Sequence, residues 1–166
     1  MTTRLPPIAY LQALRVLLAT PRLAPPEGEA GRIGAEGPEA LRIIGVGDSI
    51  IAGTGVRELR DSLTAAYARL LHARVQLPVE WRVRGRNGAT SASVLRKLVP
   101  TVPECDLYLI SVGVNDVTRR VTPGAFSRNV AGIHDKLREK APASGFLFAG
   151  VPPLERFPAL PAPLNS

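Results

Sequence analysis

Short apolar runs alternate with helical segments from Leu41 onward, and this alternation restricts the fold more than any other feature of the sequence. The apolar runs cover residues 41–46, 79–83, 107–112 and 145–151. The segments between them that predict helices are 57–76, 91–98 and 122–140. Continuous apolar runs separated by helices are typical of a parallel sheet covered on both faces. We therefore predict a three-layer α/β/α fold with a doubly wound parallel sheet.

The first 40 residues have a different character. Apolar residues recur at helical spacing over 8–19, which predicts an amphipathic helix that packs on the domain or, alternatively, lies on a membrane surface. Residues 20–40 are rich in proline, glycine and glutamate and predict a linker. The expected organisation is an N-terminal helix and linker over 1–40, followed by one domain over 41–166.

Composition excludes several classes of function. The net charge is +7, but the arginines are scattered and aromatic residues make up only 5%, so we expect no nucleic-acid partner. Cys105 is the only cysteine, and His72 and His134 are the only histidines, so we expect no disulfide, zinc site or cofactor. No apolar stretch is long enough to span a bilayer. We expect a cytoplasmic protein, with membrane-surface association or export through the N-terminal segment as the alternative; the sequence does not indicate the oligomeric state.

Three of the predicted strands end in small polar clusters. These clusters are Gly47-Asp48-Ser49, Arg86-Asn87-Gly88 and Gly113-Val114-Asn115-Asp116. Ligands of open α/β sheets bind at the carboxyl ends of the strands, and parallel strands end at the same edge. The three clusters are therefore expected to converge on one site.

Nucleotide-binding motifs do not account for the first cluster. A dinucleotide fingerprint beginning at Gly45 requires glycine at position 50, where the chain has Ile50. A phosphate-binding P-loop requires a second glycine followed by lysine, and neither is present. A flavodoxin-like phosphate loop through Ser49 and Thr54 remains an alternative.

Serine hydrolase chemistry uses all three clusters. It needs an exposed hydroxyl on a strand-to-helix turn, which Ser49 can supply, and donors for a developing oxyanion. Gly88 leaves its backbone N–H unobstructed, and Asn115 carries a side-chain amide. Each motif alone is common in ordinary turns, so the prediction depends on their combination.

The combination resembles the SGNH hydrolases, also known as GDSL-type esterases and lipases. Three segments are similar to successive blocks of that family: Val46-Gly47-Asp48-Ser49-Ile50, Asn87-Gly88-Ala89-Thr90-Ser91 and Gly113-Val114-Asn115-Asp116. The resemblance implies a serine esterase that cleaves a small-molecule carboxylic ester through an acyl-enzyme. It assigns Ser49 as the nucleophile and Gly88 and Asn115 as oxyanion donors, with Asp48 and Asp116 in supporting roles. It implies no metal or cofactor.

The sequence departs from the family in one respect. The family's last block, Asp-x-x-His, supplies the catalytic base, and it is absent from these 166 residues. His72 and His134 fall on predicted helices where the family has no catalytic residue. We expect the chain to be a fragment that lacks the last strand and its covering helix, leaves apolar sheet surface exposed and has little activity alone. The alternative is an inactive SGNH-like binding module.

Overall fold

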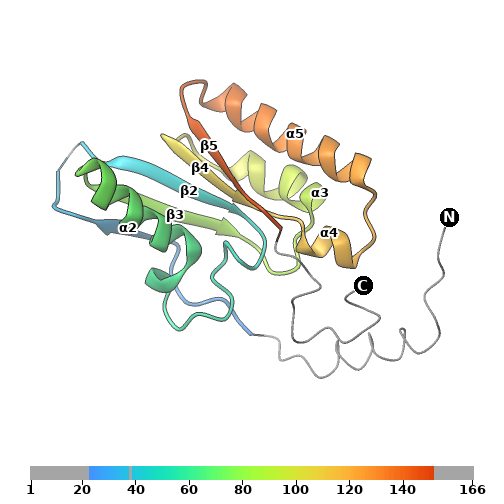
Figure 1. The fold of residues 1–166 in the computed structure, drawn as a ribbon, viewed down its shortest axis with the longest axis horizontal. Coiled ribbons are helices and arrows are strands. Elements are labelled where there is room, and N and C mark those ends of the chain that lie inside the picture. Colours follow the sequence, from blue (N-terminus) through green and yellow to red (C-terminus); the bar gives the residue numbers. More distant parts are fainter. Residues whose placement is uncertain (1–22, 38, 152–166) are drawn as a thin grey trace. The chain divides into compact units, whose positions relative to one another are not determined.

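The sheet has five strands in a computed structural model that describes residues 23–37 and 39–151 (Figure 1). The helix predicted over 8–19 lies outside the described residues. The strand order is β1-β3-β2-β4-β5, and every neighbouring pair is parallel except β1 with β3. The strands are β1 (Ala30–Ile33), β2 (Leu41–Gly47), β3 (Val79–Gly85), β4 (Leu107–Ser111) and β5 (Gly145–Ala149).

Helices cover both faces of the sheet, which confirms the predicted three-layer fold. Figure 1 shows α2 on one face and α3 and α5 on the other. Residues between the strands form η1 (Leu59–Asp61), α2 (Leu63–Val75), α3 (Ser91–Ser93), a π turn η2 (Val94–Leu98), a 3-10 turn η3 (Val99–Thr101), α4 (Val114–Thr118) and α5 (Pro123–Lys140). Helix α5 begins where its sequence predicts, because the Thr122 hydroxyl accepts a hydrogen bond from the Ala125 N–H and Pro123 occupies the first turn.

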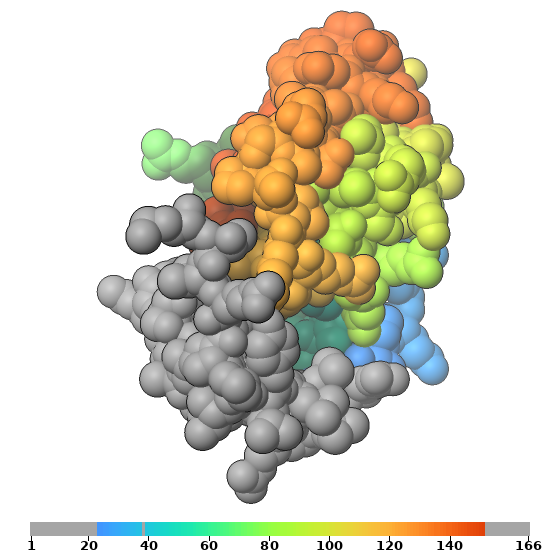
Figure 2. Space-filling view, turned by 90° about the vertical axis from the view of Figure 1, so that its right-hand side faces the viewer, coloured from blue at the N-terminus to red at the C-terminus, as the bar shows by residue number. Residues whose placement is uncertain are grey.

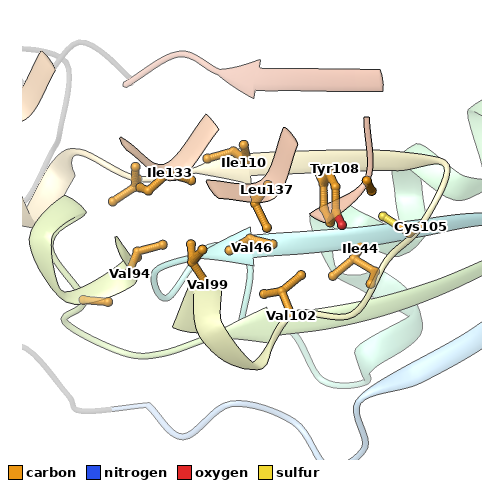
Figure 3. Close-up of a cluster of buried hydrophobic side chains, with 13 residues drawn as sticks. Ile44, Val46, Val94, Val99, Val102, Cys105, Tyr108, Ile110, Ile133 and Leu137 are labelled. Atoms are coloured by element: carbon orange, nitrogen blue, oxygen red, sulfur yellow. The ribbon is translucent and has the colours of Figure 1, made fainter. Parts of the chain in front are cut away.

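Two apolar clusters form the core, one on each side of the sheet. Alternate residues of β2 point to opposite faces, so Ile44 and Val46 pack under α5 while Ile43 packs under α2. Figure 3 shows the cluster on the α5 side, where Ile133 and Leu137 lie over β2 and β4. Fully burying each such aliphatic side chain contributes roughly 1.5–3 kcal/mol. This packing fixes the strands whose ends carry the polar clusters.

The prediction that all of residues 20–40 form a linker is wrong for 30–33. These residues form β1 and pair antiparallel with β3. Arg32 Nη1 lies 2.5 Å from Glu80 Oε1. A Cβ atom on Gly31 would lie 2.4 Å from the Trp81 ring. Glycine is therefore needed here to make room for the indole, not to make the backbone flexible. The partners that create this strand lie about 50 residues away in the sequence.

The outer edge at β5 is apolar. Leu147 and Phe148 are 37% and 42% exposed, and β4 is the only strand that pairs with β5 among residues 23–37 and 39–151. Strand β5 ends at Ala149, two residues before the predicted end. None of the helices in the described part of the chain is both long and apolar enough to cross a membrane.

Candidate active site

The loops after β2, β3 and β4 meet at the carboxyl edge of the sheet, as predicted. Gly47, the last residue of β2, pairs with Gly85 of β3 and with Ser111 of β4. Hydrogen bonds continue past the strand ends: the Asp48 N–H donates to the Ser111 carbonyl at 3.1 Å, and the Arg86 N–H donates to the Gly47 carbonyl at 3.1 Å. The sheet therefore places the residues that follow these three strands side by side.

Two glycines allow the close approach of these loops. A Cβ atom on Gly47 would lie 1.9 Å from the Ser111 carbonyl oxygen, and one on Gly85 would lie 2.2 Å from the Ala52 nitrogen. Both neighbours are backbone atoms that cannot rotate away. The turn that carries Ser49 therefore packs directly on the end of β3.

Ser49 occupies a tight turn that begins at the carboxyl end of β2. The turn is closed by hydrogen bonds from the Ala52 N–H to the Asp48 carbonyl and from the Thr54 N–H to the Ser49 carbonyl, both 3.0 Å long. Ser49 is half-buried. The Thr54 hydroxyl donates to the Asn87 side-chain oxygen, which links this turn to the loop after β3. Because Thr54 is engaged within the protein, the geometry disfavours the phosphate loop through Ser49 and Thr54.

The loops that contain Gly88 and Asn115 contact each other directly. The Asn115 side-chain amide donates to the Ala89 carbonyl at 3.1 Å, and the Arg119 guanidinium donates to the Gly88 carbonyl at 3.1 Å. Gly88 has a φ of +70°, a left-handed conformation that favours glycine. Figure 2 looks onto this edge and shows the yellow-green segment after β3 against the orange segment after β4. The structure thus brings the two expected oxyanion donors into neighbouring positions.

Asp116 is the centre of a buried polar network. Its carboxylate accepts hydrogen bonds from the Ser91 N–H at 2.8 Å and from the Ser91 hydroxyl at 2.6 Å. The Asn129 amide of α5 in turn donates to the Ser91 hydroxyl at 2.9 Å. Neither Ser91 nor Asn129 was predicted from the sequence to have a role of its own. Ser91 could have been found from its place in the second block, whereas Asn129 lies within a long helix and carries no motif.

Asp48 is a second buried carboxyl at this edge. It is 1% exposed, and its Oδ1 accepts a hydrogen bond from the Ile50 N–H at 3.0 Å. Burial raises the pKa of Asp48, and the charge of Asp116 raises it further against the effect of the backbone donor. Among the described residues neither Asp48 nor Asp116 forms an ion pair. The two carboxyls hold their loops through backbone and serine donors rather than through cations.

Neither histidine lies at the carboxyl edge. His72 is in the last turn of α2, just before β3 begins, and its Nδ1 lies 2.7 Å from the Leu77 carbonyl oxygen. The His134 ring packs against Phe146 near the start of β5, with 4.7 Å between the ring centroids and 55° between the ring planes. Both positions belong to the opposite end of the strands, so neither side chain is placed to accept a proton from Ser49. No three His, Cys, Asp or Glu side chains gather as metal ligands within residues 23–37 and 39–151.

The fold and these loops define a class of protein: a three-layer α/β domain with a serine at the turn after a central strand. Residues 46–166 match the sequence profile of the GDSL-like lipase/acylhydrolase family. The chain therefore belongs to the GDSL-like lipase/acylhydrolase family. A comparison with curated proteins gave no match.

Solved structures with the same fold include esterases and lipases. AlinE4, an SGNH-hydrolase family esterase, is 24% identical with a TM-score of 0.60, and the match covers 70% of this chain and 61% of AlinE4. TesA is 25% identical with a TM-score of 0.57, with 66% of this chain and 60% of TesA covered. The lipase Lip_vut3 from a goat rumen metagenome is 16% identical with a TM-score of 0.59, with 70% and 67% covered. The chain thus spans about three-fifths of the length of AlinE4 and TesA.

Proposed function

We propose that the protein hydrolyses carboxylic esters through an acyl-enzyme on Ser49. The Ser49 hydroxyl attacks the ester carbonyl, and the backbone N–H groups of Ser49 and Gly88 and the Asn115 amide stabilise the resulting oxyanion. The alcohol leaves as the tetrahedral intermediate collapses, and water then releases the acid from Ser49. Asp48 and Asp116 act as positioning residues for the loops.

The contact between Asn115 and the loop after β3 carries this proposal. One N–H of the Asn115 amide donates to the Ala89 carbonyl, which fixes the amide beside Gly88. The second N–H of a side-chain amide remains able to donate. Donors held in place before the reaction stabilise developing charge without reorganisation, which is the requirement for an oxyanion site. The family assignment supports the same chemistry.

The proposal requires a base that this sequence does not contain. His72 and His134 are engaged at the other end of the sheet. A histidine outside these 166 residues, oriented by an aspartate, would take the proton from Ser49 and later return it to the leaving alcohol. Without it, the 166-residue chain is expected to be nearly inactive.

Hydrolysis of 4-nitrophenyl acetate tests the proposal. It is measured for the 166-residue chain, for the protein translated from the complete reading frame that contains it, and for a Ser49→Ala variant of each. We expect turnover only in the longer protein with Ser49 intact. If neither wild-type protein hydrolyses this or a panel of other esters, ester hydrolysis is refuted.

A binding module without catalysis is the second candidate function. The observation in its favour is that both histidines lie away from the carboxyl edge while the loops at that edge remain closely packed. The same assay separates the two candidates, because a binding module predicts no turnover in either protein.

A further inference from the structure

The exposed charges around the candidate site are mostly positive. The loops that follow β2, β3 and β4 carry four exposed arginines: Arg57, Arg86, Arg119 and Arg120. The acidic residues between the same strands and the long helices that follow them are Asp48, Glu58, Asp61 and Asp116. Asp48 and Asp116 are buried, Glu58 pairs with Arg60, and Asp61 is exposed. These arginines are scattered in the sequence, but the segments that carry them all follow strands that end at this edge of the sheet.

Arg119 is the member of this group whose guanidinium is fixed. Its Nη2 donates to the Gly88 carbonyl at 3.1 Å, and a Cβ atom on Gly88 would lie 3.5 Å from the same nitrogen. The guanidinium therefore sits on the turn whose N–H is the proposed oxyanion donor. Among the described residues it forms no ion pair with a carboxylate. An arginine has five N–H donors in a rigid fork, so donors remain after this one bond.

We propose that Arg119, together with the arginines around it, binds an oxyanion group such as a carboxylate carried by the ester substrate. This inference rests on the proposed ester hydrolysis at Ser49 and names the class of substrate. An arginine fork matches the geometry of an oxyanion, and charge-assisted hydrogen bonds of this kind are about twice as strong as neutral ones. A group of like charges at a cleft also raises the local concentration of an oppositely charged ligand.

A purely structural role for Arg119 predicts a different result. If its guanidinium only braced the Gly88 turn, its loss would weaken binding of neutral and anionic ligands alike. If it binds an anion, its loss affects only the anionic ligand. The ratio of the two affinities therefore distinguishes the roles, whatever happens to the absolute values.

The test compares two stable amide analogues of phenyl esters, butyranilide and succinanilic acid, which differ by a terminal methyl or carboxylate. Dissociation constants are measured by NMR titration of the 166-residue chain, which needs no turnover. Arg119→Gln is compared with Arg74→Gln, which removes the same charge from an exposed arginine in the last turn of α2, at the opposite end of the strands. We expect the wild type to bind succinanilic acid about fivefold more tightly at low salt.

In Arg119→Gln the preference for succinanilic acid over butyranilide should fall to less than half of its wild-type value, with butyranilide binding unchanged. Arg74→Gln should keep the wild-type preference. The preference should also disappear in about 1 M salt. Equal affinities in the wild type, a preference retained in Arg119→Gln, or a parallel loss for both ligands would overturn the inference. Failure of either ligand to bind also overturns it, whereas the Ser49 hydrolysis assay decides the proposed function separately.

Discussion

Aspartates at the two ends of the parallel strands lie in opposite surroundings. At the amino end, charged side chains are exposed and paired: Arg42 Nη2 lies 3.2 Å from Asp106 Oδ1, and Arg32 pairs with Glu80. At the carboxyl end, Asp48 and Asp116 are 1% and 2% exposed and lack a cationic partner among the described residues.

This difference distinguishes exposed surface charges from the buried carboxyls of the proposed site. Exposed ion pairs contribute little free energy, typically about 0.2–1 kcal/mol each, and are easily replaced. A buried carboxylate without a cation is costly unless donors satisfy it. Local features that cost stability are expected where function requires them. The contrast therefore supports the proposal that the carboxyl end is the functional end, and four measurements test it.

The largest expected effect is on close packing at the carboxyl end. Gly85→Ala would place a Cβ atom 2.2 Å from the Ala52 backbone nitrogen, and relieving that clash should lower the free energy of unfolding by about 3 kcal/mol. Gly145→Ala at the amino end of β5 is the matched control, because its Cβ would lie 2.9 Å from the movable end of Leu107 and an ordinary 3.8 Å from the Asp106 carbonyl oxygen. Urea denaturation should show a cost below about 1 kcal/mol for the control. Equal losses of unfolding free energy in Gly85→Ala and Gly145→Ala would contradict the closer packing at the carboxyl end.

The buried network around Asp116 should outweigh an exposed ion pair. Asp116→Ala leaves the Ser91 N–H and hydroxyl without their acceptor and should cost about 2–3 kcal/mol of unfolding free energy. Asp106→Ala removes the pair with Arg42 and an acceptor for the Arg42 N–H, and should cost about 1 kcal/mol. Denaturation curves of the two variants measure the difference. A larger loss of unfolding free energy in Asp106→Ala than in Asp116→Ala would contradict this expectation, because the exposed ion pair would then stabilise the fold more than the buried network.

The two ends should also respond to pH with opposite signs. Burial and the nearby Asp116 raise the pKa of Asp48, so ionising it costs the native state free energy as the pH rises through the carboxyl range. Asp48→Asn keeps an acceptor for the Ile50 N–H and should gain stability over the wild type as the pH rises. At Asp106 partial burial acts against ionisation, but Arg42 prevails and holds the pKa of Asp106 below its ordinary value. The stabilisation that ionised Asp106 contributes is present at a pH above its ordinary pKa and is lost as the pH falls through the lowered pKa.

Asp106→Asn should therefore be less stable than the wild type at neutral pH, and its deficit should shrink in acid. Unfolding free energies of both variants between about pH 3 and pH 7 provide the measurement. The assignment of opposite environments would be contradicted if the stabilities of Asp48→Asn and Asp106→Asn, each relative to the wild type, changed in the same direction as the pH rises.

The smallest effect concerns reactivity rather than stability. Cys105, before β4 at the amino end, is buried, and burial raises the pKa of its thiol to about 11. At pH 8 only about one thiol in a thousand is then ionised. Modification by a disulfide reagent should be slow in the native protein and become rapid in urea. Rapid stoichiometric labelling of the native protein would show that the amino end also holds an accessible nucleophile.

Structural features that depend on a local sequence pattern could be predicted from the sequence. The four parallel strands and helix α5 could be predicted because each apolar run and each cap is contained in a few consecutive residues. The convergence of the three clusters followed from the common direction of parallel strands. Strand β1 could not be predicted, because its four residues acquire strand partners only when β3 brings Trp81 and Glu80 beside them.

Two residues that contact the site, Asn129 and Arg119, could not be predicted from the sequence. Asn129 lies in the middle of α5 and reaches Ser91 only after the helix packs on the sheet. Arg119 lies 31 positions from Gly88 and contacts it through the fold alone. The sequence predicts no helix over 114–118, because the five residues of α4 carry too little periodicity. Contacts between distant segments position Asn129 and Arg119, and a single sequence carries no signal for such contacts.

Covalent labelling is the most direct test of Ser49 as the nucleophile. The protein translated from the complete reading frame is treated with a fluorophosphonate, which forms a stable adduct with an activated serine, and the adduct is located by peptide mass spectrometry. We predict a single adduct on Ser49, and none at any position in Ser49→Ala. Labelling at another residue, or undiminished labelling of Ser49→Ala, would contradict the assignment of Ser49 as the nucleophile at the carboxyl edge of the sheet.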